Sequence, residues 1–203
     1  MQPITQRQMA DLPSCFLTAT DTDAGKTHVA CEILKAWQVA GLSVAAFKPV
    51  ASGAIWQNNQ WQSEDAIRLA EVTGQDLNEI NPYTFEKPAS PHIADEQSVF
   101  ELNQCVSLYR EMSLKYDRVL VEGVGGWCVP LSDKLMLKDL VLALALPVVM
   151  VSRIGLGCIN HSLLTINQIQ QDTDLFHGWI ANCIDGDFVD QTANIKSIIK
   201  RVL

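Results

Sequence analysis

The sequence lacks the features that would direct it to a membrane or out of the cell. Residues 1–14 do not have the basic and then apolar layout of a signal peptide. The longest apolar run, residues 140–151, is too short to span a bilayer and is interrupted by Pro147. We therefore expect a cytoplasmic protein that does not contact a membrane.

Common metal-binding and nucleic-acid-binding patterns are also missing. The six cysteines include no C-x-x-C pair, and the four histidines form no His-Glu-x-x-His pattern. The net charge is −8 and no run of Lys and Arg occurs, which argues against a nucleic-acid partner. We interpret the cysteines as reduced and mostly buried apolar residues.

Short apolar, β-branched runs alternate with helical patterns along the 203 residues. Strands are predicted at 15–19, 44–48, 118–122, 148–152 and 179–182, and helices at 27–40, 63–71, 101–114 and 158–170. This alternation, which has no hairpin signals, predicts an α/β fold of one domain, 1–203, with a mostly parallel sheet and helices on both faces. We expect residues 1–13 to be flexible and 54–62 to form a mobile polar loop. Ligands should gather at the carboxyl ends of the strands.

Residues 19–27 (ATDTDAGKT) connect the first strand to a helix and end in Gly-Lys-Thr. This context predicts a phosphate-binding loop and a fold like that of the P-loop NTPases. Lys26 would reach the β- and γ-phosphates, and the Thr27 hydroxyl would bind Mg²⁺. Thr20, however, stands where the usual pattern has its first glycine. The alternative is a plain strand-to-helix turn capped by Thr27.

A second lysine lies at the end of the second predicted strand, in residues 48–53 (KPVASG). Lys48 would face the same crevice as Lys26, and two such lysines favour an anionic substrate. Pro49 and Gly53 would shape a tight loop whose backbone can approach a ligand. The alternative is a lysine that only extends its ammonium group to solvent.

Two carboxylates complete the predicted site. Glu122 ends an apolar strand and is followed by Gly-Val-Gly-Gly, while Asp65 lies in the first turn of the helix that begins at Ser63. Thr27, Asp65 and Glu122 together offer the oxygen ligands of a hard dication. Asp65 could equally do no more than stabilise its helix N-terminus.

Residues 157–161 (GCINH) follow a turn and open a predicted helix. Taken alone, they read as a helix cap, with His161 in a solvated first turn. A functional role for these residues is indicated only when they are considered together with the other segments.

The segments together resemble the dethiobiotin synthetase family, whose ATP-dependent enzymes close a ureido ring in biotin synthesis. The matches follow the family's order and span residues 14–185. They are TDTDAGKT (20–27), KPVASG (48–53), NPYTF (81–85), SPHIA (90–94), VLVEGVGGW (119–127), PLSD (130–133), LGCINH (156–161) and GWIAN (178–182). The family's loop has one more residue than the usual pattern, which places its first glycine at Ala19.

The resemblance implies a role for each matching residue. Lys26 and Lys48 would be catalytic, and Thr27, Asp65 and Glu122 would hold Mg²⁺. The nucleotide would contact Asp23, Ala24, Gly25, Lys26, Thr27, Glu122, Gly123, Val124, Gly125, Asn182 and Cys183, with Asn182 at the base edge. The diamine substrate would contact Thr22, Ser52 and Lys48, and its carboxylate tail would bind Gly157, Cys158, Ile159 and Asn160 of the partner subunit in a homodimer.

The implied reaction starts from 7,8-diaminopelargonic acid, CO₂ or bicarbonate, and ATP. One amine is carbamylated, a carbamate oxygen attacks the γ-phosphate to form a carbamic-phosphoric anhydride, and the second amine closes the ring. Two lysines and a metal suit such a phosphoryl transfer, which depends on positioning and charge neutralisation. No nucleophilic side chain is needed.

Two departures from the family pattern fall on base recognition. Relatives usually continue into a segment like Gly-Glu-Ile-Pro-Trp, whereas this sequence ends at Leu203, and Cys183 stands where a polar residue is common. We therefore expect weak discrimination among nucleoside triphosphates. Two other functions stay open: a different ATPase of the same deviant phosphate-loop class, such as a cobyrinate-amidating or partitioning-type enzyme, and a catalytically idle nucleotide-binding module.

Overall fold

Five parallel strands form the central sheet of the protein. The computed structural model describes residues 1–184, 186 and 188–202. The strands are β1 (Cys15–Ala19), β2 (Val44–Phe47), β7 (Arg118–Glu122), β8 (Val148–Arg153) and β9 (Phe176–Asn182). Their order is β2-β7-β1-β8-β9, and every neighbouring pair is parallel. The predicted α/β class with a mostly parallel sheet is confirmed.

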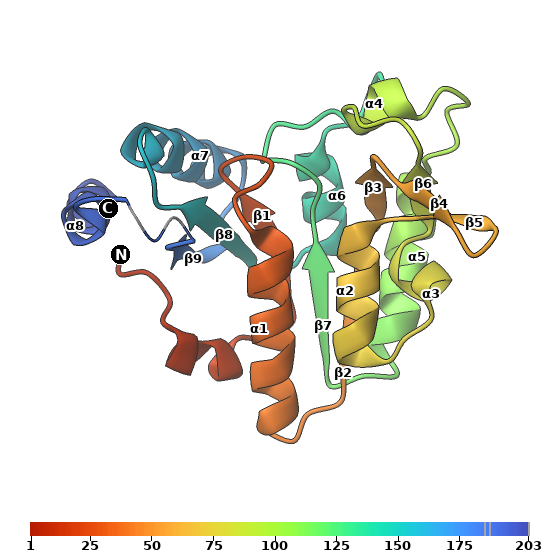
Figure 1. Cartoon of the computed structure of the whole chain (residues 1–203), viewed down its shortest axis with the longest axis horizontal. Coiled ribbons are helices and arrows are strands. Elements are labelled where there is room, and N and C mark those ends of the chain that lie inside the picture. The colour runs from red at the N-terminus through yellow and green to blue at the C-terminus, as the bar shows by residue number, and fades with distance from the viewer. Residues whose placement is uncertain (185, 187, 203) are drawn as a thin grey trace.

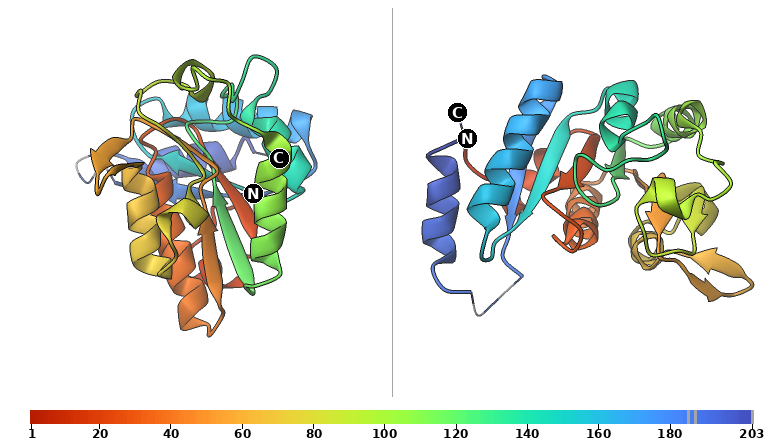
Figure 2. Two further views of the ribbon diagram at one scale, coloured as in Figure 1. Left: turned by 90° about the vertical axis from the view of Figure 1, so that its right-hand side faces the viewer. Right: turned by 90° about the horizontal axis from the view of Figure 1, so that it is seen from above.

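Helices cover both faces of this sheet (Figures 1 and 2). One face carries η1 (Gln6–Asp11), α1 (Lys26–Val39), α2 (Glu64–Thr73) and α3 (Leu77–Ile80). The other carries α5 (Leu102–Ser113), α6 (Leu137–Leu144) and α7 (Cys158–Asp172), with α8 (Gln191–Ile199) packed against α7. Alternate residues of β1 serve the two layers, since Leu17 belongs to the core under α1 and Phe16 to the core on the opposite side.

Local sequence explains where the helices beside the site begin. The apolar stripe of α1 is buried, and its Trp37 indole N–H donates to the Leu12 carbonyl at 3.0 Å. At the start of α2, the Ser63 hydroxyl accepts a hydrogen bond from the Ala66 N–H, as an N-cap should. The first turns of the two helices lie side by side, since Thr27 of α1 is hydrogen-bonded to Asp65 of α2.

One prediction about local structure was wrong. Residues 55–62 are not a loop but an antiparallel hairpin of β4 (Ile55–Gln57) and β5 (Gln60–Gln62). Asn58 and Asn59 both have positive φ, 53° and 61°, which is the geometry of a tight hairpin turn that asparagine tolerates well. Trp56 and Trp61 pair across the strands with ring centroids 5.3 Å apart. The missed signal was the Asn-Asn pair between two tryptophans.

Two smaller elements lie near this hairpin. β3 (Val50–Ser52) pairs in parallel with β6 (Tyr83–Phe85), and the short α4 (Pro91–Ala94) follows. α4 contacts β3, and β6 contacts β5 of the hairpin. Among the described residues, no helix combines the length and apolar character that crossing a membrane requires.

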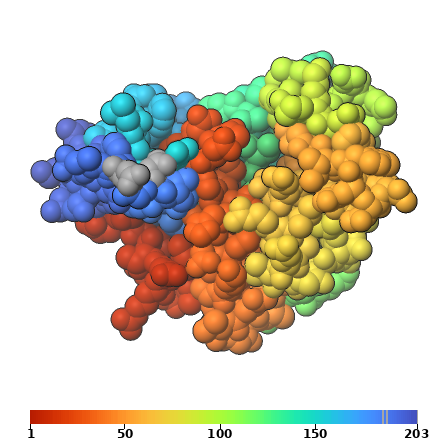
Figure 3. Space-filling model, viewed as in Figure 1, coloured from red at the N-terminus to blue at the C-terminus, as the bar shows by residue number. Residues whose placement is uncertain are grey.

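Residues 1–13, which we expected to be flexible, have a packed position. Met9 and Leu12 are buried in the core under α1, and the Ile4 N–H donates to the Trp179 carbonyl at 2.7 Å. Figure 3 shows the red surface of these residues beside the orange surface of α1. The segment therefore contacts the edge strand β9 at Gly178 and Trp179, where the sheet edge would otherwise be open.

Candidate active site

The phosphate-loop segment, residues 20–25, joins β1 to α1 in a tight turn. Gly25 occupies the N-cap of α1 with φ +83°, and a Cβ at this position would collide with the side-chain amide of Asn182. That amide donates to the Ala24 carbonyl at 2.9 Å. Both the positive φ and the contact with Asn182 therefore require glycine at this position. Asn182, at the end of β9, stabilises the phosphate loop through its hydrogen bond to Ala24.

Lys26 is buried and is held by main-chain carbonyls. Its Nζ donates to the Gly125 carbonyl at 2.7 Å and to the Asp21 carbonyl at 3.4 Å. Burial, together with the nearby Lys48 ammonium, lowers the pKa of Lys26 to about 8. The Lys26 ammonium group thus joins the phosphate loop, at Asp21, to the loop after β7, at Gly125.

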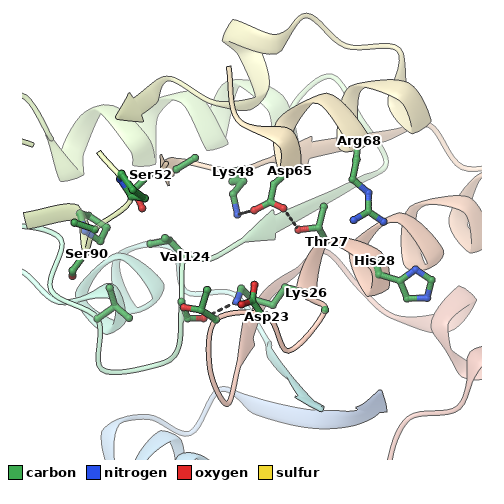
Figure 4. A pocket seen from close by; sticks show the side chains of 18 residues that line it. Asp23, Lys26, Thr27, His28, Lys48, Ser52, Asp65, Arg68, Ser90 and Val124 are labelled. Atoms are coloured by element: carbon green, nitrogen blue, oxygen red, sulfur yellow. Dashed lines mark hydrogen bonds and ion pairs between the residues drawn. The ribbon is translucent and has the colours of Figure 1, made fainter. Parts of the chain in front are cut away.

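Lys48 lies at the centre of a second set of contacts. Its Nζ is 2.8 Å from Glu122 Oε1 and 2.9 Å from Asp65 Oδ2. The Thr27 hydroxyl is 2.6 Å from Asp65 Oδ1 and 2.8 Å from Glu122 Oε1. Figure 4 shows Lys48, Asp65 and Thr27 pointing toward one another from three different elements. The four residues predicted from separate strand ends and helix starts therefore meet.

The charges of this group support one another. Burial acts to lower the pKa of Lys48, but the Glu122 and Asp65 carboxylates outweigh it and raise that pKa. Burial likewise acts to raise the pKa of Asp65, but Lys48 and the Thr27 hydroxyl outweigh it and lower that pKa. Both groups are thereby kept charged.

Glu122 retains one oxygen for a further partner. The residue is 1% exposed, and its Oε2 has no hydrogen-bond partner among the described residues. A buried carboxylate oxygen without a partner is costly, so this oxygen is suited to bind a ligand. Thr27, Asp65 and Glu122 offer oxygen atoms alone, so this donor set fits Mg²⁺.

A cavity of about 670 Å³ opens above these groups. Ten of the predicted residues line it: Thr22, Asp23, Gly25, Lys26, Thr27, Lys48, Ser52, Asp65, Val124 and Gly125. Its volume falls in the range of small-molecule sites. The amine ends of Lys26 and Lys48 therefore serve one cleft, as the sequence predicts.

Other predicted residues lie outside this cavity. Gly123 packs closely on Phe16 and Leu137 and offers only its carbonyl, 3.4 Å from Lys48 Nζ. Ala24, Asn182 and Cys183 do not line the cavity, and Cys183 is exposed. Gly157, with φ +90°, is the N-cap of α7, and residues 158–160 form the first turn of that helix, also outside the cavity. Within one chain, these four residues are not brought to Lys48.

The sequence reasoning missed several lining residues. His28 and Arg68 lie on the far side of Thr27 from Lys48, and Ser90 lies at the opposite end of the cavity (Figure 4). Arg68 follows Asp65 by one helical turn, a spacing that could have predicted it. Ser90 belongs to the matching SPHIA segment, to which no role was given.

Comparison with known proteins connects this geometry to a family. The family model described as an AAA domain matches residues 14–202. The ATP-dependent dethiobiotin synthetase BioD of Aromatoleum aromaticum is 38% identical over 198 residues, which cover 96% of this chain and 88% of that protein. BioD 1 of Escherichia coli O157:H7 is 42% identical over 171 residues, 82% of this chain and 76% of that protein. The chain belongs to the dethiobiotin synthetase family.

Solved structures place the dethiobiotin synthetase chain among P-loop ATPases by fold. A ParA family ATPase from Chlorobium tepidum has a TM-score of 0.55 at 15% identity, covering 95% of this chain and 83% of that one. The MinC:MinD complex of Aquifex aeolicus has a TM-score of 0.56 at 16% identity, covering 94% and 78%. At these identities the likeness shows the fold alone. The predicted P-loop NTPase-like fold is confirmed.

Proposed function

We propose that this protein closes the ureido ring of dethiobiotin from 7,8-diaminopelargonic acid, CO₂ and ATP, as an ATP-dependent ligase of biotin biosynthesis. The observation that carries the proposal is that Lys26, Thr27, Lys48 and Asp65 line one cavity, with Glu122 buried against Thr27 and Lys48. Family membership supports the same conclusion. We also propose the residue roles given in the following paragraphs.

The phosphates of ATP would lie on the phosphate loop. The N–H groups of residues 23–27 and the N-terminus of α1 provide donors, and Lys26 provides a charge that is held by main-chain carbonyls. Thr27, Asp65 and Glu122 would hold Mg²⁺, which when bound would neutralise charge that develops on the phosphates. The main-chain contacts of Lys26 fix its ammonium group for transfer of the γ-phosphoryl group.

Lys48 would bind the carbamate formed on one amine of the diamine. Its ammonium group is a second lysine cation in the cavity, and Ser52 and Val124 line the same space. A carbamate oxygen would attack the γ-phosphorus while ADP leaves, and the second amine would then attack the carbamoyl carbon and expel phosphate. The carbamate and the transferring phosphoryl group are both negative, so a cation for each is what the reaction requires.

The turn at residues 157–160 lies outside the cavity of its own chain. We therefore propose a homodimer in which this turn binds the carboxylate tail of the diamine held by the partner subunit. Light scattering would give the oligomeric state. Mixing inactive Lys48→Met with inactive Asn160→Ala subunits should restore partial activity, and failure of a confirmed mixed dimer to do so would contradict the shared site.

Isotope transfer tests the chemistry most directly. With ¹⁸O-labelled CO₂ supplied at short reaction times, the released phosphate should carry one labelled oxygen, because the carbamate oxygen becomes the bridging atom of the anhydride. Phosphate release should also need both the diamine and bicarbonate. An unlabelled phosphate would contradict the route, and release without the diamine would indicate an idle or different ATPase. A cytoplasmic location is proposed as well and agrees with six free cysteines.

A further inference from the structure

One end of the 670 Å³ cavity has a serine and a histidine that the reaction described above does not use. Ser90 lines the cavity, and His92 Nδ1 lies 3.0 Å from the Ser90 hydroxyl, behind the lining. Figure 4 shows Ser90 on the same side of the cavity as Ser52 and opposite to His28. Ser90 therefore lies at the end that the diamine would occupy, away from the nucleotide.

Helix capping does not account for the Ser90 hydroxyl. Ser90 is the N-cap residue of α4, yet within the described chain its side chain makes no capping hydrogen bond. The hydroxyl lies 3.4 Å from the Pro130 carbonyl, to which it can donate, and 3.0 Å from the His92 ring. These contacts place the hydroxyl between the cavity and His92.

The segment that carries Ser90 is fixed by its neighbours. The Gly53 N–H donates to the Lys87 carbonyl at 3.1 Å, and α4 contacts β3, the strand that ends at Ser52. On the other side, the His92 N–H donates to the Pro130 carbonyl at 3.4 Å. The hydroxyl and the imidazole are thereby positioned before a substrate binds, as proton transfer through a hydrogen bond requires.

An amine of the diamine must lose a proton before it can react. An alkylammonium group has a pKa of about 10, so at neutral pH its nitrogen has no free electron pair with which to attack CO₂ or the anhydride. Among the titratable side chains that line the cavity, the two lysines would hold anions and Asp65 the metal, while Asp23 lies on the phosphate loop. His28 and Arg68 lie at the opposite end from Ser90 (Figure 4). A base is needed at the Ser90 end, and His92 provides one.

We propose that Ser90 and His92 form a proton relay that deprotonates an amine of the diamine. An N–H bond of the ammonium group breaks, and its proton passes to the Ser90 oxygen while the Ser90 hydroxyl proton passes to His92 Nδ1. The electron pair stays on the amine nitrogen, and the serine is left unchanged. His92 is only half-buried, so its imidazolium can return a proton to solvent. This inference rests on the proposed function, because it assumes that a diamine is the substrate.

Turnover of Ser90→Ala, His92→Ala and His92→Asn tests the relay. Loss of general-base catalysis should lower kcat about 100-fold in each, while KM for ATP changes less than about threefold. His92→Asn is the decisive variant, because its amide can still hydrogen-bond to Ser90 but does not take up a proton. Near-full turnover of His92→Asn would overturn the proposal, since a structural role survives this exchange. His177→Asn is the matched control, because His177 is exposed and does not line the cavity.

The deficit of Ser90→Ala should also shrink as the pH rises. Between pH 8 and pH 9 the neutral fraction of a free alkylamine increases about tenfold, so the ratio of kcat/KM for the diamine between the unaltered protein and Ser90→Ala should fall about tenfold. Lys26 and Lys48, the charged groups that would face the amine, are common to both proteins, so their ionisation cancels in the ratio. A ratio that stays constant over this range would contradict the relay.

Calorimetric titration with the diamine separates proton transfer from binding. All three variants should bind the diamine within about threefold of the unaltered protein, because the relay acts on bound substrate. A loss of diamine affinity that matches the loss of kcat/KM would assign Ser90 and His92 to binding alone and overturn the relay. If the unaltered protein released no phosphate with diamine, bicarbonate and saturating ATP, the proposed function itself would fail, which is a separate outcome.

Discussion

The two lysines of the site are held in opposite ways. Lys26 donates to two main-chain carbonyls, and its pKa is lowered to about 8. Lys48 touches two carboxylates, and its pKa is raised. Within the part of the chain that the structure describes, Lys26 therefore has no carboxylate in ion-pair contact, whereas Lys48 has two.

This difference separates what each lysine contributes to the fold from what it contributes to the reaction. Burying Lys26 beside Lys48 costs free energy that the carboxylates of Glu122, Asp65 and Asp21 offset only in part, so a ligand anion would stabilise it further. Lys48 compensates Glu122, which is buried beside it, so the fold depends on Lys48 even without a ligand. Substitution of either lysine should therefore lower activity to a similar degree, whereas only substitution of Lys48 should lower the free energy of unfolding.

The largest expected effect is on turnover of Lys26→Met. Loss of the ammonium group should lower kcat/KM more than about 100-fold, equivalent to about 3 kcal/mol of transition-state stabilisation. The free energy of unfolding should stay level or rise, because an imperfectly compensated buried charge is removed. Phosphate-release kinetics and urea unfolding measure the two quantities. Near-full turnover would contradict the role of Lys26.

Lys48→Met should lose activity to a similar degree and also lose stability. Glu122 would remain buried without its cation, which should lower the free energy of unfolding by about 3 kcal/mol. Urea unfolding of the two methionine variants side by side makes the comparison. The double variant Lys48→Met/Glu122→Gln should recover part of the loss. Equal stability of the two single variants would show that the two environments do not differ as described.

Trp127→Phe should have a smaller effect that reaches Lys26 indirectly. The Trp127 indole N–H donates to Asp172 Oδ2 at 2.8 Å and fixes the loop that carries the Gly125 carbonyl. Losing this hydrogen bond should lower the free energy of unfolding by about 1–2 kcal/mol. Thermal unfolding checks that value, and KM for ATP should rise more than kcat falls. An unchanged melting temperature would refute the anchoring role.

The smallest expected effect concerns pH. Burial acts to raise the pKa of Asp172, but hydrogen bonds from Trp127, Gln168 and Lys138 outweigh it and lower that pKa. The stability from this carboxylate is thus present above its unfolded pKa of about 4 and is lost as the pH falls through the lower folded value. The stability advantage over Asp172→Asn should therefore shrink between about pH 5 and pH 3 in urea unfolding. An advantage that grows toward low pH would contradict this.

The sequence predicted the elements that position the site because each has a local cause. The apolar stripe of α1, the Ser63 cap of α2 and the carboxylate that ends β7 are all visible in the letters. Parallel strands bring their carboxyl ends to one edge, so the meeting of Lys26, Lys48 and Glu122 follows from topology.

Features that depend on contacts between distant segments could not be predicted. No local pattern shows that the Asn182 amide supports the phosphate loop or that Ile4 lies along β9. The hairpin at residues 55–62 was missed for another reason: its turn uses two asparagines in place of glycine. His28 was missed because its place at the cavity depends on how α1 packs against α2, whereas the helical spacing of Arg68 from Asp65 was a usable signal.

The hydrogen bond from the Ile4 N–H to the Trp179 carbonyl has a practical consequence for making the protein. A sheet border whose amide and carbonyl groups are uncovered recruits the same border of other molecules. Trimming the first few residues, or fusing a bulky tag directly before them, should therefore promote precipitation at high concentration. The other end of the chain is no remote alternative, because the Met1 ammonium group donates to the Val202 carbonyl at 3.2 Å and a tag there would adjoin the same segment.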